Sequence, residues 1–420
     1  MLLNFKVKNF RSIKNEVEIS MIADKGTEHK SNLVNIPIIK DAILKGIAIL
    51  GPNGSGKSNI LRAIGAVANA VLIGPSTDKQ SKIDAFSLIE PFCFDKACIN
   101  KPSIFSLDYT YENNRYVFFI KLDRKRIYQE KLYIYKKGRK TLIYRTEWNE
   151  ADKKYEFFIG TTLKNEQRDA LNQVKKWLGA YSFLKTVARE ENETLNFIKP
   201  AYEWFKLINT ITPYRSCRDM GYDYASHLIY MEPKLKNLIT RFMQMADVAI
   251  EDIFVEKLDG DEYKVYFGYK NKSGKVQKIP FEEDSTGTRR LFQIAADFIA
   301  ALTQDESLLV FDELGAELHP AIIANLLMIY FNDNKGEGNK QVIFSTHMDD
   351  VMDTLRRDQI YFAEKQISQL DTQLYKMSDF EGIRKDADKK KAYRKGIFGA
   401  YPFVTLDDLI SACDETEGSD

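Results

Sequence analysis

One short motif constrains the fold of this chain more than any other part of its 420 residues, because it requires a strand, a turn and a helix in succession. Residues 51–58 read GPNGSGKS, a complete G-x-x-x-x-G-K-S pattern. The apolar run at 43–50 predicts a buried strand before it, and the apolar segment from about 59 to 72 predicts a helix after it. The glycines let successive backbone N–H groups point at phosphate oxygens, so the motif indicates a phosphate-binding loop.

Side chains of the motif supply the remaining chemistry. Lys57 provides a cation for the β- and γ-phosphates, and the Ser58 hydroxyl is a ligand for Mg²⁺. The following helix adds the dipole of its N-terminus. A chance glycine-rich turn would not need the flanking strand and helix, so we predict ATP and Mg²⁺ as cofactors. The residues predicted to bind the nucleotide here are Gly51, Pro52, Asn53, Gly54, Ser55, Gly56, Lys57, Ser58 and Asn59.

Two acidic residues end an apolar strand far downstream, where residues 308–313 read LLVFDE. A buried strand of this kind delivers Asp312 to the carboxyl edge of the sheet, beside the phosphate loop, where it can hold the Mg²⁺ shell. Glu313 can face the other way and polarise the attacking water. An acidic pair at a strand end is ambiguous alone, but with the loop upstream it indicates ATP hydrolysis.

A further apolar strand, residues 341–347 (QVIFSTH), ends in a histidine. A lone histidine at a strand end is more often structural than catalytic. His347 follows the acidic pair by some 35 residues, as a third parallel strand of the same sheet would require. His347 is therefore predicted to reach the γ-phosphate as a sensor.

Composition limits the remaining classes of protein. The 61 basic and 60 acidic residues nearly cancel, which argues against a generally basic nucleic-acid coat and an acidic disordered tail. Apolar residues make up 44%, enough for a sizeable core. No apolar stretch approaches the roughly 18 residues of a membrane helix, and the first 20 residues read as a strand and not as a signal peptide. We expect a soluble cytoplasmic protein with no membrane partner.

The hydrophobic pattern divides the chain into four parts. Period-two alternation from about 103 to 160 predicts an antiparallel meander, and helical spacing follows to about 250. After Thr286, helices and strands alternate as in an α/β core. The predicted parts are an N-terminal part of an ATPase head (1–75), a β lobe (76–160), a helical insertion (161–250) and a C-terminal part of the head with a tail (251–420).

Several of these motifs resemble the ABC-type ATPases, in the branch that holds SMC-like, RecF-like and OLD-type defence proteins. The similar segments are KVKNFRSIKN (6–15), DELGAELHP (312–320) and STH (345–347). This resemblance implies an α/β fold, namely an ABC-type P-loop ATPase head that carries the β-meander lobe and the helical insertion.

The C-terminal region is similar, more narrowly, to the AAA-type ATPases of abortive-infection and restriction-linked operons, the AbiL and RloA type. The similar segments are RRDQIYFAEK (356–365), KMSDFEGIRKD (376–386) and AYRKGIFGAYP (392–402). The resemblance is strong at both ends of the chain and weak between about 76 and 280.

ABC-type ATPases hydrolyse ATP between two protomers, each facing the signature loop of the other. The usual LSGGQ is absent, and the matching position reads STGTRR from Ser285 to Arg290. Ser285 and Gly287 at a helix start would form an anion site for a γ-phosphate presented in trans, although a plain N-cap explains the same residues. Arg11, in NFRS, is predicted to approach the base or ribose; the alternative is a surface arginine.

Basic residues gather at 121–145, where ten stand against two acids with tyrosines between them, and again at 384–395. These clusters fit contact with nucleic acid. They equally fit a solvated sheet face or the docking of a protein partner.

The resemblance implies a prokaryotic anti-phage ATPase that forms a homo-oligomer and controls a separately encoded effector, often a nuclease. Two alternatives stay open: a DNA-repair or recombination ATPase of the RecF or SMC type, and a scaffold that binds ATP with negligible turnover.

Overall fold

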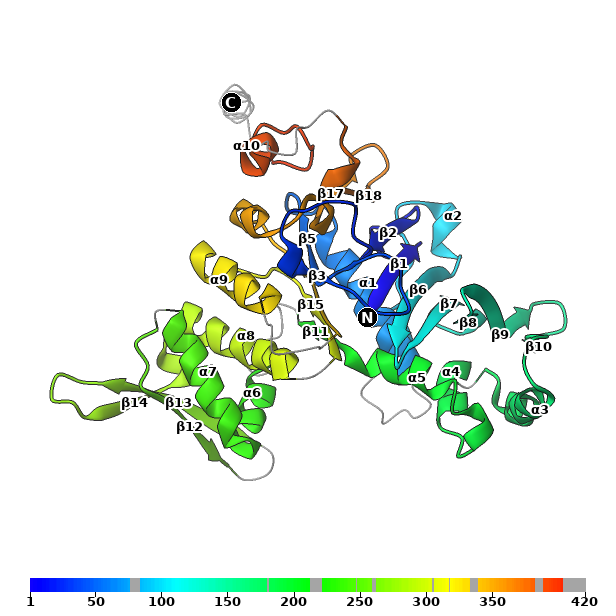
Figure 1. The fold of residues 1–420 in the computed structure, drawn as a ribbon, viewed down its shortest axis with the longest axis horizontal. Coiled ribbons are helices and arrows are strands. Elements are labelled where there is room, and N and C mark those ends of the chain that lie inside the picture. The colour runs from blue at the N-terminus through cyan, green and yellow to red at the C-terminus, as the bar shows by residue number, and fades with distance from the viewer. Residues whose placement is uncertain are drawn as a thin grey trace, which may run out of the picture.

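The protein has two large sheets with one long helix between them, as a computed structural model shows (Figure 1). The central helix is α1 (Lys57–Leu72), which begins directly after the phosphate loop. The structure describes residues 1–75, 84–179, 181–211, 221–246, 248–258, 262–303, 306–316, 318–332, 339–381 and 388–402. This arrangement confirms the predicted fold class, an α/β head with an antiparallel meander and a helical insertion.

The first sheet holds the phosphate loop and is parallel except for its last strand. In spatial order its described strands are β11 (Ile208–Ile211), β15 (Glu306–Phe311), β16 (Asn339–Ser345), β5 (Gly46–Leu50), β17 (Ile360–Gln366) and β18 (Asp371–Lys376). Both faces are buried, because Ile47 and Ile49 of β5 pack into one core and Ala48 and Leu50 into the other. Burial on both faces explains why β5 reads as an unbroken apolar run.

The second sheet is antiparallel and contains the predicted meander. In spatial order its described strands are β10 (Lys154–Ile159), β9 (Arg139–Asn149), β8 (Ile127–Lys136), β7 (Asn114–Leu122), β6 (Ser103–Tyr111), β1 (Leu2–Lys8) and β2 (Val17–Ser20). The meander thus continues into the N-terminal strands across the predicted boundary at 75/76. β1 pairs with β6 in this sheet, so the edge of β6 does not remain unpaired.

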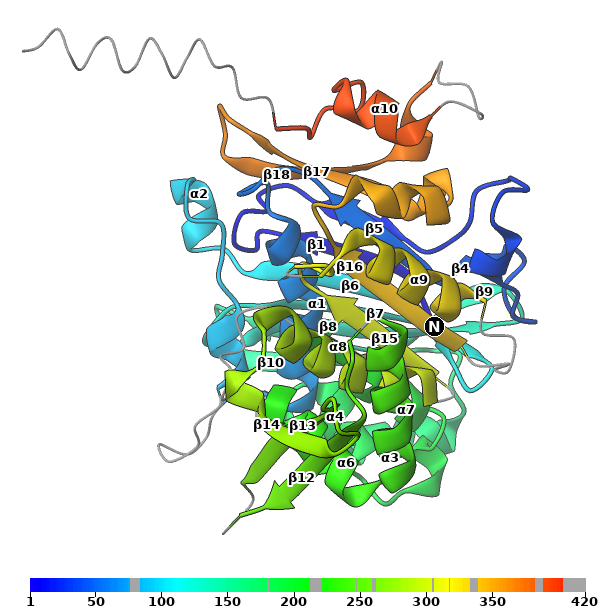
Figure 2. The same cartoon turned by 90° about the vertical axis from the view of Figure 1, so that its left-hand side faces the viewer.

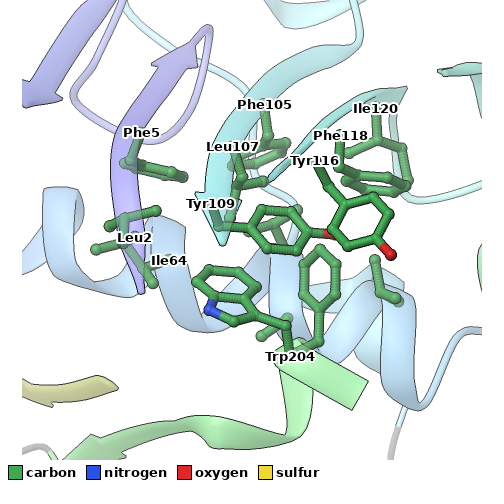
Figure 3. Close-up of a cluster of buried hydrophobic side chains, with 14 of the residues drawn as sticks. Leu2, Phe5, Ile64, Phe105, Leu107, Tyr109, Tyr116, Phe118, Ile120 and Trp204 are labelled. Carbon is green, nitrogen blue, oxygen red and sulfur yellow. The ribbon is translucent and has the colours of Figure 1, made fainter. Parts of the chain in front are cut away.

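The core between this sheet and α1 is largely aromatic (Figure 3). Tyr109 of β6 stacks on Trp204, with ring centroids 4.0 Å apart, and its hydroxyl donates to the carbonyl of Ala201. Ile64 of α1 lies against the same cluster in Figure 3. The segment α5 (Lys199–Glu203) and η5 (Trp204–Leu207) therefore closes the space beneath α1.

The predicted helical insertion is helical in most of its described residues, but it differs from the prediction in contributing a strand. β11 (Ile208–Ile211) joins the edge of the parallel sheet beside β15. The helices of this part are α3 (Asn165–Val174), α4 (Phe183–Ala188), α5, α6 (Gly221–Met231) and α7 (Pro233–Met245). Three of the four residues of β11 are apolar or β-branched, which suits a strand at the sheet edge. A signal of this length cannot be separated from the surrounding helical pattern.

The last two helices of the insertion pack on the C-terminal part of the chain, at the lower left of Figure 1. There α6 and α7 contact α8 (Thr286–Thr303), next to a small antiparallel sheet. The strands of that sheet are β12 (Asp252–Lys257), β13 (Tyr263–Lys270) and β14 (Val276–Pro280).

At the opposite end of the molecule, α10 (Lys389–Arg394) lies at the top of Figure 2, above β17 and β18. The other described strands and α-helices are β3 (Leu33–Val34), β4 (Ile43–Leu44), α2 (Lys96–Ile99) and α9 (Pro320–Phe331). In the described part of the chain, no helix has the length and apolar character needed to cross a bilayer.

Candidate nucleotide-binding site

The phosphate loop connects β5 to α1. At two of its glycines, the surrounding structure leaves no room for a side chain. A Cβ on Gly51 would lie 2.2 Å from the carbonyl oxygen of Ala363 in β17. A Cβ on Gly56, whose φ is 101°, would lie 2.1 Å from the hydroxyl of Thr372 in β18. Only glycine fits at these positions, because both the space and the left-handed backbone exclude larger residues.

Lys57 is buried and folds back over the loop. Its ammonium donates to the carbonyl oxygens of Gly51 at 2.7 Å and Pro52 at 3.0 Å. Burial lowers the pKa of Lys57 to about 8, against the opposing effect of Glu313 and Asp312. The ammonium is thus held inside the loop by weak neutral acceptors, which a phosphate group can replace.

Ser58 and Asp312 meet as predicted, although 254 residues separate them. The Ser58 hydroxyl donates to Asp312 Oδ1 at 2.9 Å. Asp312 is 1% exposed, and its Oδ2 has no hydrogen-bond partner among the described residues. A hydroxyl beside a buried carboxylate with a spare oxygen fits Mg²⁺, which prefers oxygen ligands and retains several waters.

Ser345, at the end of β16, links the two acidic residues and was not among the predicted site residues. Its hydroxyl donates to Asp312 Oδ1 at 2.8 Å and accepts the backbone N–H of Glu313 at 2.7 Å. Glu313 has a φ of 57°, a conformation that costs a non-glycine residue energy and that this bond helps to hold. The sequence signal that could have identified Ser345 is the apolar strand QVIFS, which ends in this serine.

The order of the strands explains this link. β16 lies between β5 and β15, so its carboxyl end stands between the phosphate loop and the acidic pair. His347 follows two residues later, after Thr346, whose N–H donates to Ile49 of β5. The His347 side chain is exposed, and its pKa is lowered mainly by partial burial and then by the Lys57 charge, against Glu313 and Asp312.

Arg11 lies near the site but is engaged by another partner. Its backbone N–H donates to the carbonyl of Glu90, and its guanidinium forms an ion pair with the Glu90 carboxylate at 3.2 Å. Arg11 and Asp312 both line one pocket of about 140 Å³ beside α1. A role in binding the base or ribose stays a prediction.

The other predicted nucleotide residues are placed as follows. Asn53 and Gly54 are exposed at the tip of the loop, and the Asn59 amide donates to Ser12. Ser285 caps α8, because its hydroxyl accepts the N–H of Thr288 at 3.1 Å. Within the described residues, the contacts of Ser285 are with Asp284, Thr288 and Arg289, and not with the phosphate loop of the same chain.

Among solved structures, the chain is similar to SMC head domains at low identity. The SMC head domain from Thermotoga maritima is 14% identical, with a TM-score of 0.41, covering 89% of this chain and 98% of that one. An SmcHead bound to the C-winged helix domain of ScpA is 14% identical, with a TM-score of 0.45, covering 89% and 97%. An Smc head domain with an extended coiled coil, bound to the C-terminal domain of ScpA derived from Pyrococcus furiosus, is 13% identical, with a TM-score of 0.42, covering 90% and 96%.

A comparison with curated proteins gives no significant match. Residues 47–353 match the family described as "AAA domain, putative AbiEii toxin, Type IV TA system". The matched range begins in β5, includes the phosphate loop, Asp312, Glu313 and His347, and ends in η7 (Asp349–Thr354). Because this range covers most of the chain, the protein belongs to that AAA-domain family.

Proposed function

We propose that this protein is a Mg²⁺-dependent ATPase. The observation that carries the proposal is the hydrogen-bonded chain from Ser58 through Asp312 and Ser345 to Glu313. It joins the end of the phosphate loop to two acids of different burial. Asp312 is buried, while Glu313 is half-buried.

This chain separates the roles of the two acids. Ser58 and Asp312 would hold Mg²⁺, which when bound neutralises phosphate charge and orients the leaving group. Lys57 would exchange its carbonyl partners for phosphate oxygens. Glu313 would accept the proton of the attacking water as a general base, and His347 would contact the γ-phosphate.

The cellular role that we propose is phage defence by abortive infection. The protein would act in the cytoplasm as a homo-oligomer that controls a separately encoded effector, with a nuclease as the first candidate. Support comes from the family description, which names a putative toxin of a toxin–antitoxin system. The resemblance of residues 356–402 to the AbiL and RloA type supports the same role.

The positions of Ser285 and Gly287 at the N-terminus of α8 support assembly through ATP. Ser285 is exposed, and Gly287 is half-buried, in the first turn of the helix. Backbone N–H groups there are suited to bind an anion from outside the chain. We propose that this anion is the γ-phosphate of ATP held by a second copy.

A second candidate, an ATPase that acts with DNA or RNA as RecF- and SMC-like proteins do, is supported by the outer face of the meander. Lys131 of β8 lies directly opposite Arg145 of β9, and the pair is flanked in register by Phe119 and Phe158. Lys131 lies over the ring of Phe119 and Arg145 over that of Phe158. Like charges opposite each other destabilise a sheet. Glu147, 3.7 Å from Arg145, supplies one negative charge against the two positive ones, so a further anionic partner would relieve the remaining repulsion.

Steady-state hydrolysis of ATP tests the main proposal. The wild type should release phosphate only with Mg²⁺, and Glu313→Gln should lower kcat by roughly 10²- to 10⁴-fold while ATP still binds. Unchanged turnover in Glu313→Gln would remove that residue from catalysis. Binding without any turnover would favour the scaffold, and stimulation of hydrolysis by DNA or RNA would favour the second candidate.

A further inference from the structure

A short network of hydrogen bonds joins the phosphate loop to two segments that are distant in the sequence. The hydroxyl of Thr372, in β18, lies 2.8 Å from Ser12 Oγ and 3.0 Å from the carbonyl oxygen of Ser55. The Asn59 amide, in the first turn of α1, donates to the same Ser12 oxygen at 2.8 Å. One end of the network is therefore Ser55 in the phosphate loop, and the other end is Asn59 in α1.

The chemistry of these groups fixes the direction of each bond. A carbonyl oxygen only accepts, so the single proton of the Thr372 hydroxyl goes to Ser55. The Ser12 hydroxyl then donates to Thr372 and accepts from Asn59. Thr372 and Ser55 are each 1% exposed and Ser12 is 8% exposed, so water does not replace a lost donor cheaply.

The hairpin of β17 and β18 contacts both ends of the phosphate loop. The carbonyl oxygen of Ala363, in β17, lies 2.2 Å from the place of a Cβ on Gly51, and the hydroxyl of Thr372 lies 2.1 Å from the place of a Cβ on Gly56. The loop has no room to shift toward this hairpin.

Asp371, next to Thr372, ties the hairpin to the N-terminal turn. Its Oδ1 accepts the N–H of Lys14 at 2.7 Å, and its Oδ2 accepts the Asn15 amide at 2.8 Å. The backbone N–H of Thr372 also donates to the carbonyl of Ser12 at 2.9 Å. Thr372 is thus held in place independently of its hydroxyl.

We propose that Thr372 is a positioning residue for nucleotide binding, acting through the Ser55 carbonyl. The Ser55 carbonyl and the Gly56 N–H belong to one peptide unit, in which they point in opposite directions because the unit is planar and trans. When Thr372 holds the carbonyl toward the hairpin, the Gly56 N–H must point away from it, into the loop. The inference rests on the proposed function, since the N–H group acts on a bound phosphate.

Thr372→Val tests the proposal, because valine keeps the shape and removes only the hydroxyl. We expect the Kd for ATP and for ADP to rise alike, by about fivefold to tenfold, as for the loss of one neutral hydrogen bond. At saturating ATP, kcat should stay within about twofold, and Thr372→Ser should restore wild-type affinity. The matched control is Thr240→Val, which removes a buried hydroxyl that donates to a backbone carbonyl at 2.9 Å in α7.

The outcomes separate this inference from the proposed function. A wild type that binds neither nucleotide would contradict the proposed function itself. A wild type that binds both, with Thr372→Val equally tight, would overturn the role of Thr372 alone, as would an equal loss in Thr240→Val. If Thr372→Val does not fold, Ser12→Ala replaces it: a Kd raised about twofold to threefold supports the network, and an unchanged Kd contradicts it.

Discussion

At the scale of single residues, Lys57 is the cation on which the proposed phosphate binding depends. Its pKa of about 8 in the free protein lies below the ordinary value because the side chain is buried. A bound phosphate favours the ammonium and raises that pKa again. Above pH 8 the free protein must therefore take up a proton in order to bind nucleotide.

This linkage predicts a pH-dependent affinity. The Kd for ADP should be flat up to about pH 8 and then rise by up to about tenfold per pH unit. Calorimetric titrations between pH 7.5 and 9.5 measure the slope and the proton uptake together. Lys57→Arg, whose charge is permanent, should give a flat profile. A wild-type affinity that does not change over this range would contradict the lowered pKa.

Ser345 gives a second prediction at the scale of a single side chain. Ser345→Ala removes the donor to Asp312 and the acceptor of the Glu313 N–H together. Hydrogen bonds to charged groups are worth more than neutral ones, so we expect kcat to fall on the order of tenfold to 100-fold. Ser307→Ala, a buried serine at the opposite end of β15, is the control. Equal rates for the two variants would show that Ser345 does not position Glu313.

At the scale of elements, the local pattern predicted most of the structure around the site. The turn from β5 into α1 and the acids after β15 follow from apolar runs and glycines that lie close together in the sequence. The same pattern does not state which strands are neighbours. The place of β16 beside β5, and so between β5 and β15, depends on contacts between residues hundreds of positions apart. The contact of Thr372 with Gly56 does so too. A single sequence carries no signal for such contacts.

The outer face of the meander gives a prediction at this scale. If Lys131 and Arg145 bind nucleic acid, the double substitution Lys131→Glu and Arg145→Glu should weaken binding of a single-stranded oligonucleotide by at least tenfold and reduce its salt dependence. The control is the double substitution Lys272→Glu and Lys275→Glu, on the exposed turn between β13 and β14. It changes the net charge by the same amount on a different part of the surface. Equal losses from both pairs, or no binding by the wild type, would contradict a nucleic-acid site on this face.

At the scale of the whole molecule, the prediction concerns assembly. Glu313→Gln with ATP and Mg²⁺ should sediment as a dimer or larger species, since ATP bound between two copies stabilises the assembled form. Adding Gly287→Asp should reverse this by placing a carboxylate against the γ-phosphate. A carboxylate in the first turn of α8 stabilises the helix itself, so unfolding would not explain the loss.

Two further measurements interpret that experiment. The double variant should still bind ATP through its own phosphate loop, and Ser273→Asp, on the exposed turn before β14, should leave assembly intact. Assembly that ignores both ATP and Gly287 would show that another surface holds the copies together.

The order of strands in the parallel sheet also means that the phosphate loop is not a self-contained stretch of sequence. β5 leads into the loop, but its neighbours β16 and β17 are the 339–345 and 360–366 segments of the chain. A fragment that ends before residue 371 therefore lacks Thr372, which lies against Gly56 of the loop. We expect such a fragment to bind a nucleotide more weakly than residues 1–420 do, because part of the surroundings of the loop is missing.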